Sequence, residues 1–178
     1  MRATPLLLLL FTLFLSLPQA SKAAGDIEIA GDIVQILIPS VAYGTTLYLH
    51  DEKGETQMYQ SFFTTVAITQ SLKYGINRKR PNGGNHSFPS GHTSAALQGA
   101  AFIHQRYGLK PAIPAYIGAA FVGYSRIYAD KHFGSDVLAG ALIGTLSSFY
   151  FTEPYQQGLS ITPTATKTGY GLQLSKRW

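Results

Sequence analysis

Residues 89–107 read PSGHTSAALQGAAFIHQRY, and this stretch carries the helix around which the rest of the chain can be arranged. Ser90 is a favoured N-cap residue, and the predicted helix runs from there to Tyr107-Gly108. The free backbone N–H groups of Gly91 and His92 in the first turn can bind an anion, with the helix dipole behind them. Taken alone, the four-residue string P-S-G-H is a weak signal, and a capped helix start that carries an incidental histidine is the default interpretation.

Four further helix-like segments accompany this one, at about residues 32–49, 56–74, 111–127 and 134–151. Short polar breaks separate them, and a loop rich in Gly, Asn and Pro covers residues 77–89. Small residues such as Gly118 and Gly144 recur in the last two segments and favour close helix packing. The sequence therefore predicts an all-α protein, a compact bundle of about five core helices.

The two ends of the chain differ from this bundle. Residues 1–23 are typical of a secretory signal, with Arg2, an apolar run and a small-x-small cleavage site. The apolar run of residues 6–17 is short for a membrane span of roughly 20 residues, which favours cleavage. We expect a helical domain at residues 24–152 and a polar tail at residues 153–178. The end of the tail alternates like a short strand, but we favour a frayed terminus.

Composition narrows the class of protein. Charged residues make up 13% of the chain, against roughly 25% in an average soluble domain, and apolar residues make up 46%. These values exclude a disordered protein and fit helices packed in or against a membrane. The absence of cysteine excludes disulfides, thiolate metal sites and cysteine nucleophiles.

The net charge of +5 is concentrated around the 77–89 loop. Lys73, Arg78, Lys79 and Arg80 lie within eight positions, and Arg126 follows near the end of another helix. Lys73 and Arg80 share a helix face if their helix continues that far. Cations delivered from separate segments suit phosphate better than they suit nucleic acid. For Arg78 and Lys79 we favour a solvated surface.

His132 and Asp136 form a second candidate pair, four residues apart at the start of the segment 134–151. On one helix face, the carboxylate would accept from one imidazole nitrogen and leave the other with a free lone pair. Such a histidine can act as a nucleophile or a general base. A purely structural polar pair at a helix start is the alternative.

Three motifs occur in order: K-x6-R-P at residues 73–81, P-S-G-H at residues 89–92 and S-R-x5-H-x3-D at residues 125–136. At every fixed position the sequence resembles the signature of the type 2 phosphatidic acid phosphatase and vanadium haloperoxidase superfamily. The resemblance implies that His132 attacks phosphorus to form a phosphohistidine, that Asp136 orients His132, and that His92 protonates the leaving oxygen. It also implies a phosphate cradle of Lys73, Arg80, Ser90, Gly91 and Arg126. His86 is a weaker candidate for contact with substrate.

The resemblance further implies catalysis without a metal or other cofactor, with vanadate as an inhibitory mimic of phosphate. Members of the family act on membrane lipids or on small phosphate esters, or are haloperoxidases, which are generally much longer than this chain. We favour a phosphorylated lipid substrate (phosphatidate-like, isoprenyl pyrophosphate or lipid A phosphate). The alternative is a soluble periplasmic acid phosphatase acting on small phosphomonoesters.

The order of the segments predicts one topology. If residue 24 lies outside the cell membrane and five segments cross it, all three motifs fall on the external face. The uncharged runs at 33–49, 56–72 and 111–125 are slightly short for comfortable spans. We therefore expect an exported, membrane-embedded or membrane-associated protein with its active site on the periplasmic side and no nucleic-acid partner.

Overall fold

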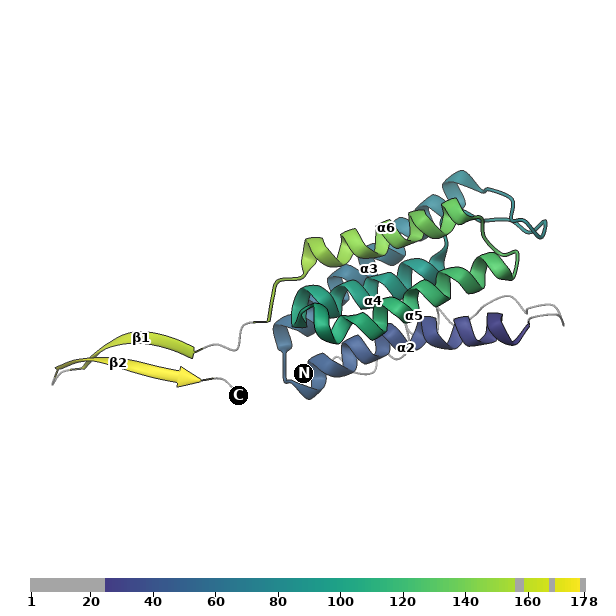
Figure 1. Cartoon of the computed structure of the whole chain (residues 1–178). Coiled ribbons are helices and arrows are strands. Elements are labelled where there is room, and N and C mark those ends of the chain that lie inside the picture. Colours follow the sequence, from purple (N-terminus) through teal and green to yellow (C-terminus); the bar gives the residue numbers. More distant parts are fainter. Residues whose placement is uncertain (1–24, 156–158, 167–168, 177–178) are drawn as a thin grey trace.

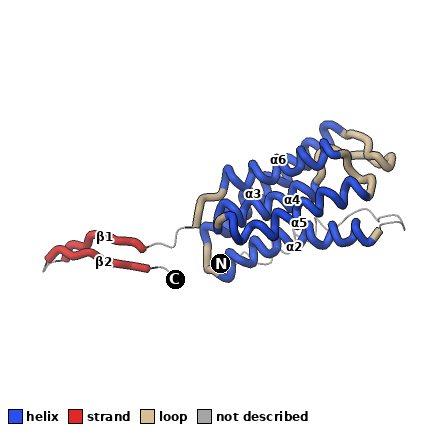
Figure 2. Tube along the Cα trace, viewed as in Figure 1, coloured by secondary structure: helices blue, strands red, loops and turns tan. Residues whose placement is uncertain are grey.

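The computed structural model describes residues 25–155, 159–166 and 169–176 and contains five helices followed by two strands (Figures 1 and 2). The expected signal, residues 1–23, lies outside the described residues. The elements are α2 (Asp26–Tyr48), α3 (Glu52–Ile76), α4 (Gly91–Tyr107), α5 (Leu109–Tyr128), α6 (Gly134–Phe151), β1 (Leu159–Thr166) and β2 (Gly169–Lys176). The predicted all-α bundle is confirmed.

Capping residues explain where the helices begin and end. Asp51 caps α3, because its Oδ1 accepts from the N–H of Gly54 at 2.9 Å. Asn77 ends the same helix in the left-handed conformation, with φ at 45°. Ser90 caps α4 as predicted, and its Oγ accepts from the N–H of Thr93. Since α3 ends at Ile76, the helix does not continue as far as Arg80, and the condition under which Lys73 and Arg80 would share a helix face is not met.

The central helix is α4, which packs against α2, α3, α5 and α6. Glycines on α6 make the closest approach possible, because a Cβ on Gly140 would overlap the carbonyl oxygen of Ser90. One turn later, a Cβ on Gly144 would overlap the backbone of Ser94 and Gln98. The small-residue spacing noted in the sequence therefore lies at a helix contact.

Polar and apolar side chains are distributed unusually across the bundle. Buried positions of α3 carry Gln57, Ser61, Thr65 and Thr69, and Gln98 of α4 donates to Ser61 Oγ at 2.8 Å. Exposed aliphatic side chains instead repeat every four residues on three helices: Ile29, Ile33, Leu37 and Val41 on α2; Leu109, Ile113 and Ile117 on α5; Leu138, Leu142 and Leu146 on α6. Among the described helices, α2 meets the length and hydropathy of a membrane span.

The tail departs from the expected frayed terminus. Residues 159–166 and 169–176 form an antiparallel pair in which Thr166 opposes Gly169. The pair extends away from the helices (Figure 1). The alternation at the C-terminus therefore indicated a strand, and the preference for a frayed end is wrong.

Candidate active site

All three motifs lie at one end of the bundle, where the loop between α3 and α4 meets the loop between α5 and α6 (Figure 1). The two loops are joined directly, because the N–H of Asn82 donates to the carbonyl of Asp130 at 3.1 Å. The N–H of Ser90 donates to the carbonyl of Asp136 at 2.9 Å, which ties the start of α4 to the start of α6.

Lys73 reaches the P-S-G-H segment from the last turn of α3. Its Nζ donates to the carbonyls of Pro89 at 2.8 Å and of His86 at 3.0 Å. Its stem passes over Gly91, where an added Cβ would lie 3.7 Å from Lys73 Cε. The ammonium therefore lies beside the N-terminus of α4. His86 Nδ1 lies 3.1 Å from the backbone carbonyl of Lys73. His86 therefore contacts both the backbone and the ammonium group of this lysine.

Arg80 is placed by a tight turn and not by a helix. Its N–H donates to the carbonyl of Gly84 at 2.7 Å, and its Nε donates to the carbonyl of Asn85 at 3.0 Å. Burial and the charge of Arg126 lower the pKa of the Arg80 guanidinium. The two positive charges repel each other, so an oxyanion bound between Arg80 and Arg126 would be stabilised by both.

Arg126 is the most enclosed cation of the set, with 2% of its side chain exposed. Its Nη1 donates to Asp32 Oδ1 at 2.7 Å, its Nη2 donates to the carbonyl of Glu28 at 2.7 Å, and its Nε donates to Ser125 Oγ at 3.1 Å. The first helix of the bundle thus orients a guanidinium that belongs to the third motif.

His132 lies buried between these groups, with 3% of its side chain exposed. Its Nδ1 lies 2.6 Å from the carbonyl oxygen of Ser87. A carbonyl can only accept, so Nδ1 carries the proton and Nε2 keeps its lone pair. Burial, together with the charges of Lys73, Arg80 and His92, lowers the pKa of His132 to about 2. The imidazole is therefore neutral and nucleophilic at physiological pH.

Asp136 does not bond His132 directly, contrary to the expectation from their spacing. Its Oδ2 lies 3.9 Å from His132 Nδ1. His132 precedes the first turn of α6, so the two residues do not share a helix face. Asp136 instead accepts from Ser87 Oγ at 2.5 Å, from the N–H of Phe133 at 2.9 Å and from Arg78 Nη1 at 2.7 Å. Ser87 therefore connects the carboxylate to the imidazole.

His92 occupies the first turn of α4, as predicted. Its Nε2 is buried and lies 3.1 Å from Asp32 Oδ1, but the two atoms are not aligned as a hydrogen bond. Gly91 and His92 also place their backbone N–H groups at the helix N-terminus, beside Lys73. Within the described residues, no group of three or more His, Asp or Glu side chains is arranged to hold a metal ion.

Sequence reasoning missed four residues of this site. Asp32 and Glu28 come from α2, outside all three motifs, and their only signal was an acidic residue on an apolar helix. Ser87 lies just before the second motif and carries no signal of its own. Arg78 is not a solvated surface residue, because it bonds Asp136 and Ser135 Oγ at 2.8 Å.

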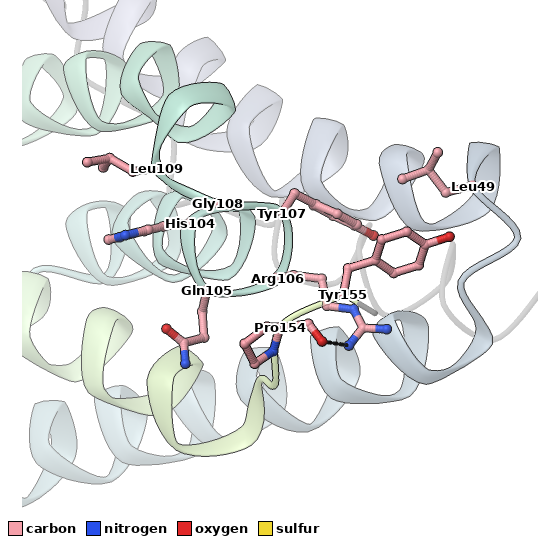
Figure 3. A pocket seen from close by; sticks show the side chains of 9 residues that line it. All are labelled: Leu49, His104, Gln105, Arg106, Tyr107, Gly108, Leu109, Pro154 and Tyr155. Carbon is pink, nitrogen blue, oxygen red and sulfur yellow. Dashed lines mark hydrogen bonds between the residues drawn. The ribbon is translucent and has the colours of Figure 1, made fainter. Parts of the chain in front are cut away.

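A separate pocket of about 570 Å³ lies at the opposite end of the bundle, lined by Leu49, Pro154, Tyr155 and residues 104–109 (Figure 3). Arg106 in this pocket donates to both carboxylate oxygens of Asp51 and to the carbonyl of Glu153 at 2.8 Å. No residue of the three motifs lines it. Arg106 thus fastens the end of α4 to the start of α3 and to the segment after α6.

Known proteins resemble this chain in sequence. The chain is 30% identical over 174 residues to the lipid A 1-phosphatase of Porphyromonas gingivalis, covering 86% of this chain and 36% of that protein. It is 28% identical to the lipid A 4'-phosphatase of Helicobacter pylori, covering 84% of this chain and 81% of that protein. The chain therefore spans about a third of the length of the Porphyromonas relative.

The fold has a solved counterpart in the crystal structure of LpxE from Aquifex aeolicus. The TM-score is 0.61 at 24% identity, covering 80% of this chain and 92% of that chain. The model of the PAP2 superfamily matches residues 55–157, a range that includes all three motifs. The expected family is thereby confirmed, and the chain belongs to the PAP2 superfamily.

Proposed function

We propose that this protein removes a phosphate group from a membrane lipid, with His132 as the nucleophile. One observation carries the proposal: a buried, neutral imidazole with a free Nε2 lies close to Lys73 and Arg80, and the Arg126 guanidinium lies close to Arg80. The cations and the N–H groups at the start of α4 would bind the non-bridging oxygens of a phosphate group. Such binding is strongest when charge spreads onto those oxygens in the transition state.

In the first step, His132 Nε2 attacks phosphorus and the bond from phosphorus to the leaving oxygen breaks. His92 gives its proton to that oxygen, which leaves as a lipid hydroxyl or a lipid monophosphate. The new phosphohistidine carries charge on its ring, and the carbonyl of Ser87 stabilises it by accepting from Nδ1–H. The negative charge of Asp136, 3.9 Å away, adds to this stabilisation.

In the second step, water replaces the lipid. His92, now neutral, takes a proton from a water molecule that attacks phosphorus on the opposite side from Nε2. The N–P bond breaks, and inorganic phosphate leaves while His132 regains its lone pair. His92 is protonated again and ready for the next substrate, so the cycle balances without a cofactor. Vanadate would inhibit by occupying the same cradle.

The surface of the bundle supports a lipid environment. The aliphatic stripes on α2, α5 and α6 face outward, whereas hydroxyl and amide side chains fill contacts between helices. A water-soluble bundle has the reverse distribution, and exposed apolar surface of this kind marks contact with a membrane or a partner. We place the site on the external face of the cell membrane, reached after export.

Lipid substrates are favoured over small phosphate esters for a second reason. The relatives named above are lipid A phosphatases, and an undecaprenyl-diphosphatase of Sulfolobus acidocaldarius is 36% identical over 101 residues. Their names share one chemistry, a phosphate group at the polar end of a large lipid. We propose the same substrate class for this chain.

The test measures phosphate release from lipid A, undecaprenyl pyrophosphate and phosphatidate in mixed micelles, with p-nitrophenyl phosphate as the small ester. Turnover of a lipid by the wild type, its loss in His132→Ala, and its retention in His50→Asn would support the proposal. His50 is exposed and has a φ of 51°, a conformation that asparagine also accepts, so the control removes a histidine without strain. Turnover of the small ester alone, by protein that stays soluble, would favour the periplasmic acid phosphatase instead.

A further inference from the structure

The first helix places a carboxylate between two groups of the active site. Asp32 Oδ1 accepts from Arg126 Nη1 at 2.7 Å and lies 3.1 Å from His92 Nε2. One oxygen atom therefore approaches both the enclosed cation of the cradle and the imidazole of His92, the residue proposed to protonate the leaving group. Asp32 belongs to none of the three motifs.

The surrounding contacts hold α2 in the position that this requires. Gly31 faces α5 so closely that a Cβ there would overlap Ser125 Oγ. The carbonyl of Glu28 accepts from Arg126 Nη2, and the buried Glu28 carboxylate pairs with Lys131 Nζ at 3.1 Å. Asp32 is thus anchored on both sides by contacts between α2 and the segment 125–131.

Asp32 also differs in charge from the other groups around His92. Burial above all, and then the charges of Arg126 of α5 and Lys73 of α3, disfavour a protonated His92, whereas Asp32 of α2 favours it. His132 faces the same group as a neutral imidazole. The carboxylate of α6, Asp136, is bonded to Arg78 and Ser87 instead. A histidine among cations loses its proton readily, and an acid catalyst must keep it until the leaving oxygen takes it.

We propose that Asp32 is a positioning residue for the general acid: it orients Arg126 and keeps the proton on His92 before the lipid leaves. This inference rests on the proposed function, since it assumes that His92 protonates the leaving oxygen. It assigns to the first helix a part in catalysis, in addition to its part in the bundle.

The experiment compares Asp32→Asn with Asp26→Asn in the full chain. Both variants remove one negative charge from α2, but Asp26 is exposed in its first turn. For Asp32→Asn we expect the alkaline limb of kcat/KM to move about one pH unit toward acid, because an opposite charge at this distance shifts a titration by about that much or more. We expect a larger loss with a lipid phosphate than with p-nitrophenyl phosphate, whose leaving oxygen needs less protonation. Asp26→Asn should match the wild type.

Different results would separate the possible explanations. An unmoved alkaline limb with equal losses on both substrates would mean that Asp32 only holds Arg126, and this would overturn the inference. Tighter inhibition by vanadate with an unmoved alkaline limb would also overturn the inference, because it would mean that Asp32 only competes with phosphate for Arg126. Where turnover is too slow to measure, NMR titration of the His92 ring in the wild type and in Asp32→Asn tests the same shift toward acid pH. A wild type that hydrolyses no phosphate ester would count against the proposed function instead.

Discussion

At the scale of single residues, the nucleophile and its carboxylate are linked through Ser87. The Asp136 side chain is completely buried, and its carboxylate accepts hydrogen bonds from Ser87 Oγ, Arg78 and the N–H of Phe133. Within the described residues, the hydrogen-bond partner of the His132 ring is the carbonyl of Ser87. The carboxylate therefore builds the loop in which the imidazole is held, and the two residues should respond differently to substitution.

We expect Asp136→Ala to lower the free energy of unfolding by about 1–3 kcal/mol, because it leaves buried donors without an acceptor. His132→Ala should change stability by about 1 kcal/mol or less while abolishing turnover. Denaturant unfolding and phosphate release, measured on the same preparations, check both values. Equal stability losses in the two variants would contradict the role assigned to Asp136.

A second prediction at this scale concerns pH. A denatured His132 takes up a proton below about pH 6.5, whereas burial and nearby cations hold the pKa of the native imidazole at about 2. The unfolded state thus binds the extra proton, so stability falls as the pH drops below about 6.5, by up to about 1.4 kcal/mol per pH unit. The effect is absent above that pH.

The measurement is the difference in unfolding free energy between the wild type and His132→Ala at pH 7 and pH 5, which removes the contribution of other groups. The wild type should lose more stability than the variant over this interval. Saturating phosphate should reduce the loss, because a bound oxyanion offsets the charges of Lys73 and Arg80. A pH-independent difference would show that the native imidazole titrates normally.

At the scale of elements, the contact between α4 and α6 connects stability with the phosphate site. Gly140 of α6 touches the carbonyl of Ser90, the residue that caps α4. Gly140→Ala should destabilise the protein by about 1–3 kcal/mol, as overpacking does, and should lower activity by displacing the N-terminus of α4.

Gly44→Ala is the matched control for this substitution. Gly44 lies within α2, and nothing lies within 4 Å of an added Cβ. Removing a glycine from a helix should there raise stability by up to about 1 kcal/mol. Phosphate release and thermal unfolding are measured for both variants. Wild-type activity in Gly140→Ala would show that the contact between α4 and α6 does not affect the phosphate site.

The elements also show what the sequence can and cannot predict. Ser90, Gly108 and Phe133 lie at helix boundaries, and the predicted helices agree with the structure within a few residues for α4 and α6. The resemblance to the family signature pointed to eight candidate site residues, and the structure places them at one end of the bundle. The predicted end of α3 at residue 74 is close to the observed Ile76, whereas α2 begins six residues and α3 four residues before the predicted starts at 32 and 56.

Contacts between distant segments lay beyond sequence reasoning. Asp32 lies 94 positions from Arg126, and no periodicity or spacing connects them. Ser87 supplies its backbone carbonyl to His132. Every residue type has this carbonyl, so the sequence carries no signal for the contact. Roles of this kind depend on how the helices pack, so the motifs could suggest candidate site residues but not the contacts that hold them in place.

At the scale of the whole molecule, the inverted distribution of polar and apolar side chains predicts how the protein meets lipid. Leu142 lies midway along α6 in its outward stripe, with 53% of its surface exposed. In water, a lysine at such a position would change stability by less than about 0.5 kcal/mol. In the centre of a bilayer, the same charge costs about 2.5–3.5 kcal/mol or more.

We therefore expect Leu142→Lys to reduce the amount of folded protein in washed membranes several-fold. Tyr150→Lys is the control, because Tyr150 is 83% exposed near the end of α6, where a lysine can reach the polar surface of the membrane. Its membrane fraction should equal that of the wild type. If both variants accumulate normally and remain active in the soluble fraction, the stripes on α2, α5 and α6 do not face lipid. The substrate would then have to reach the site from water, as the acid phosphatase alternative requires.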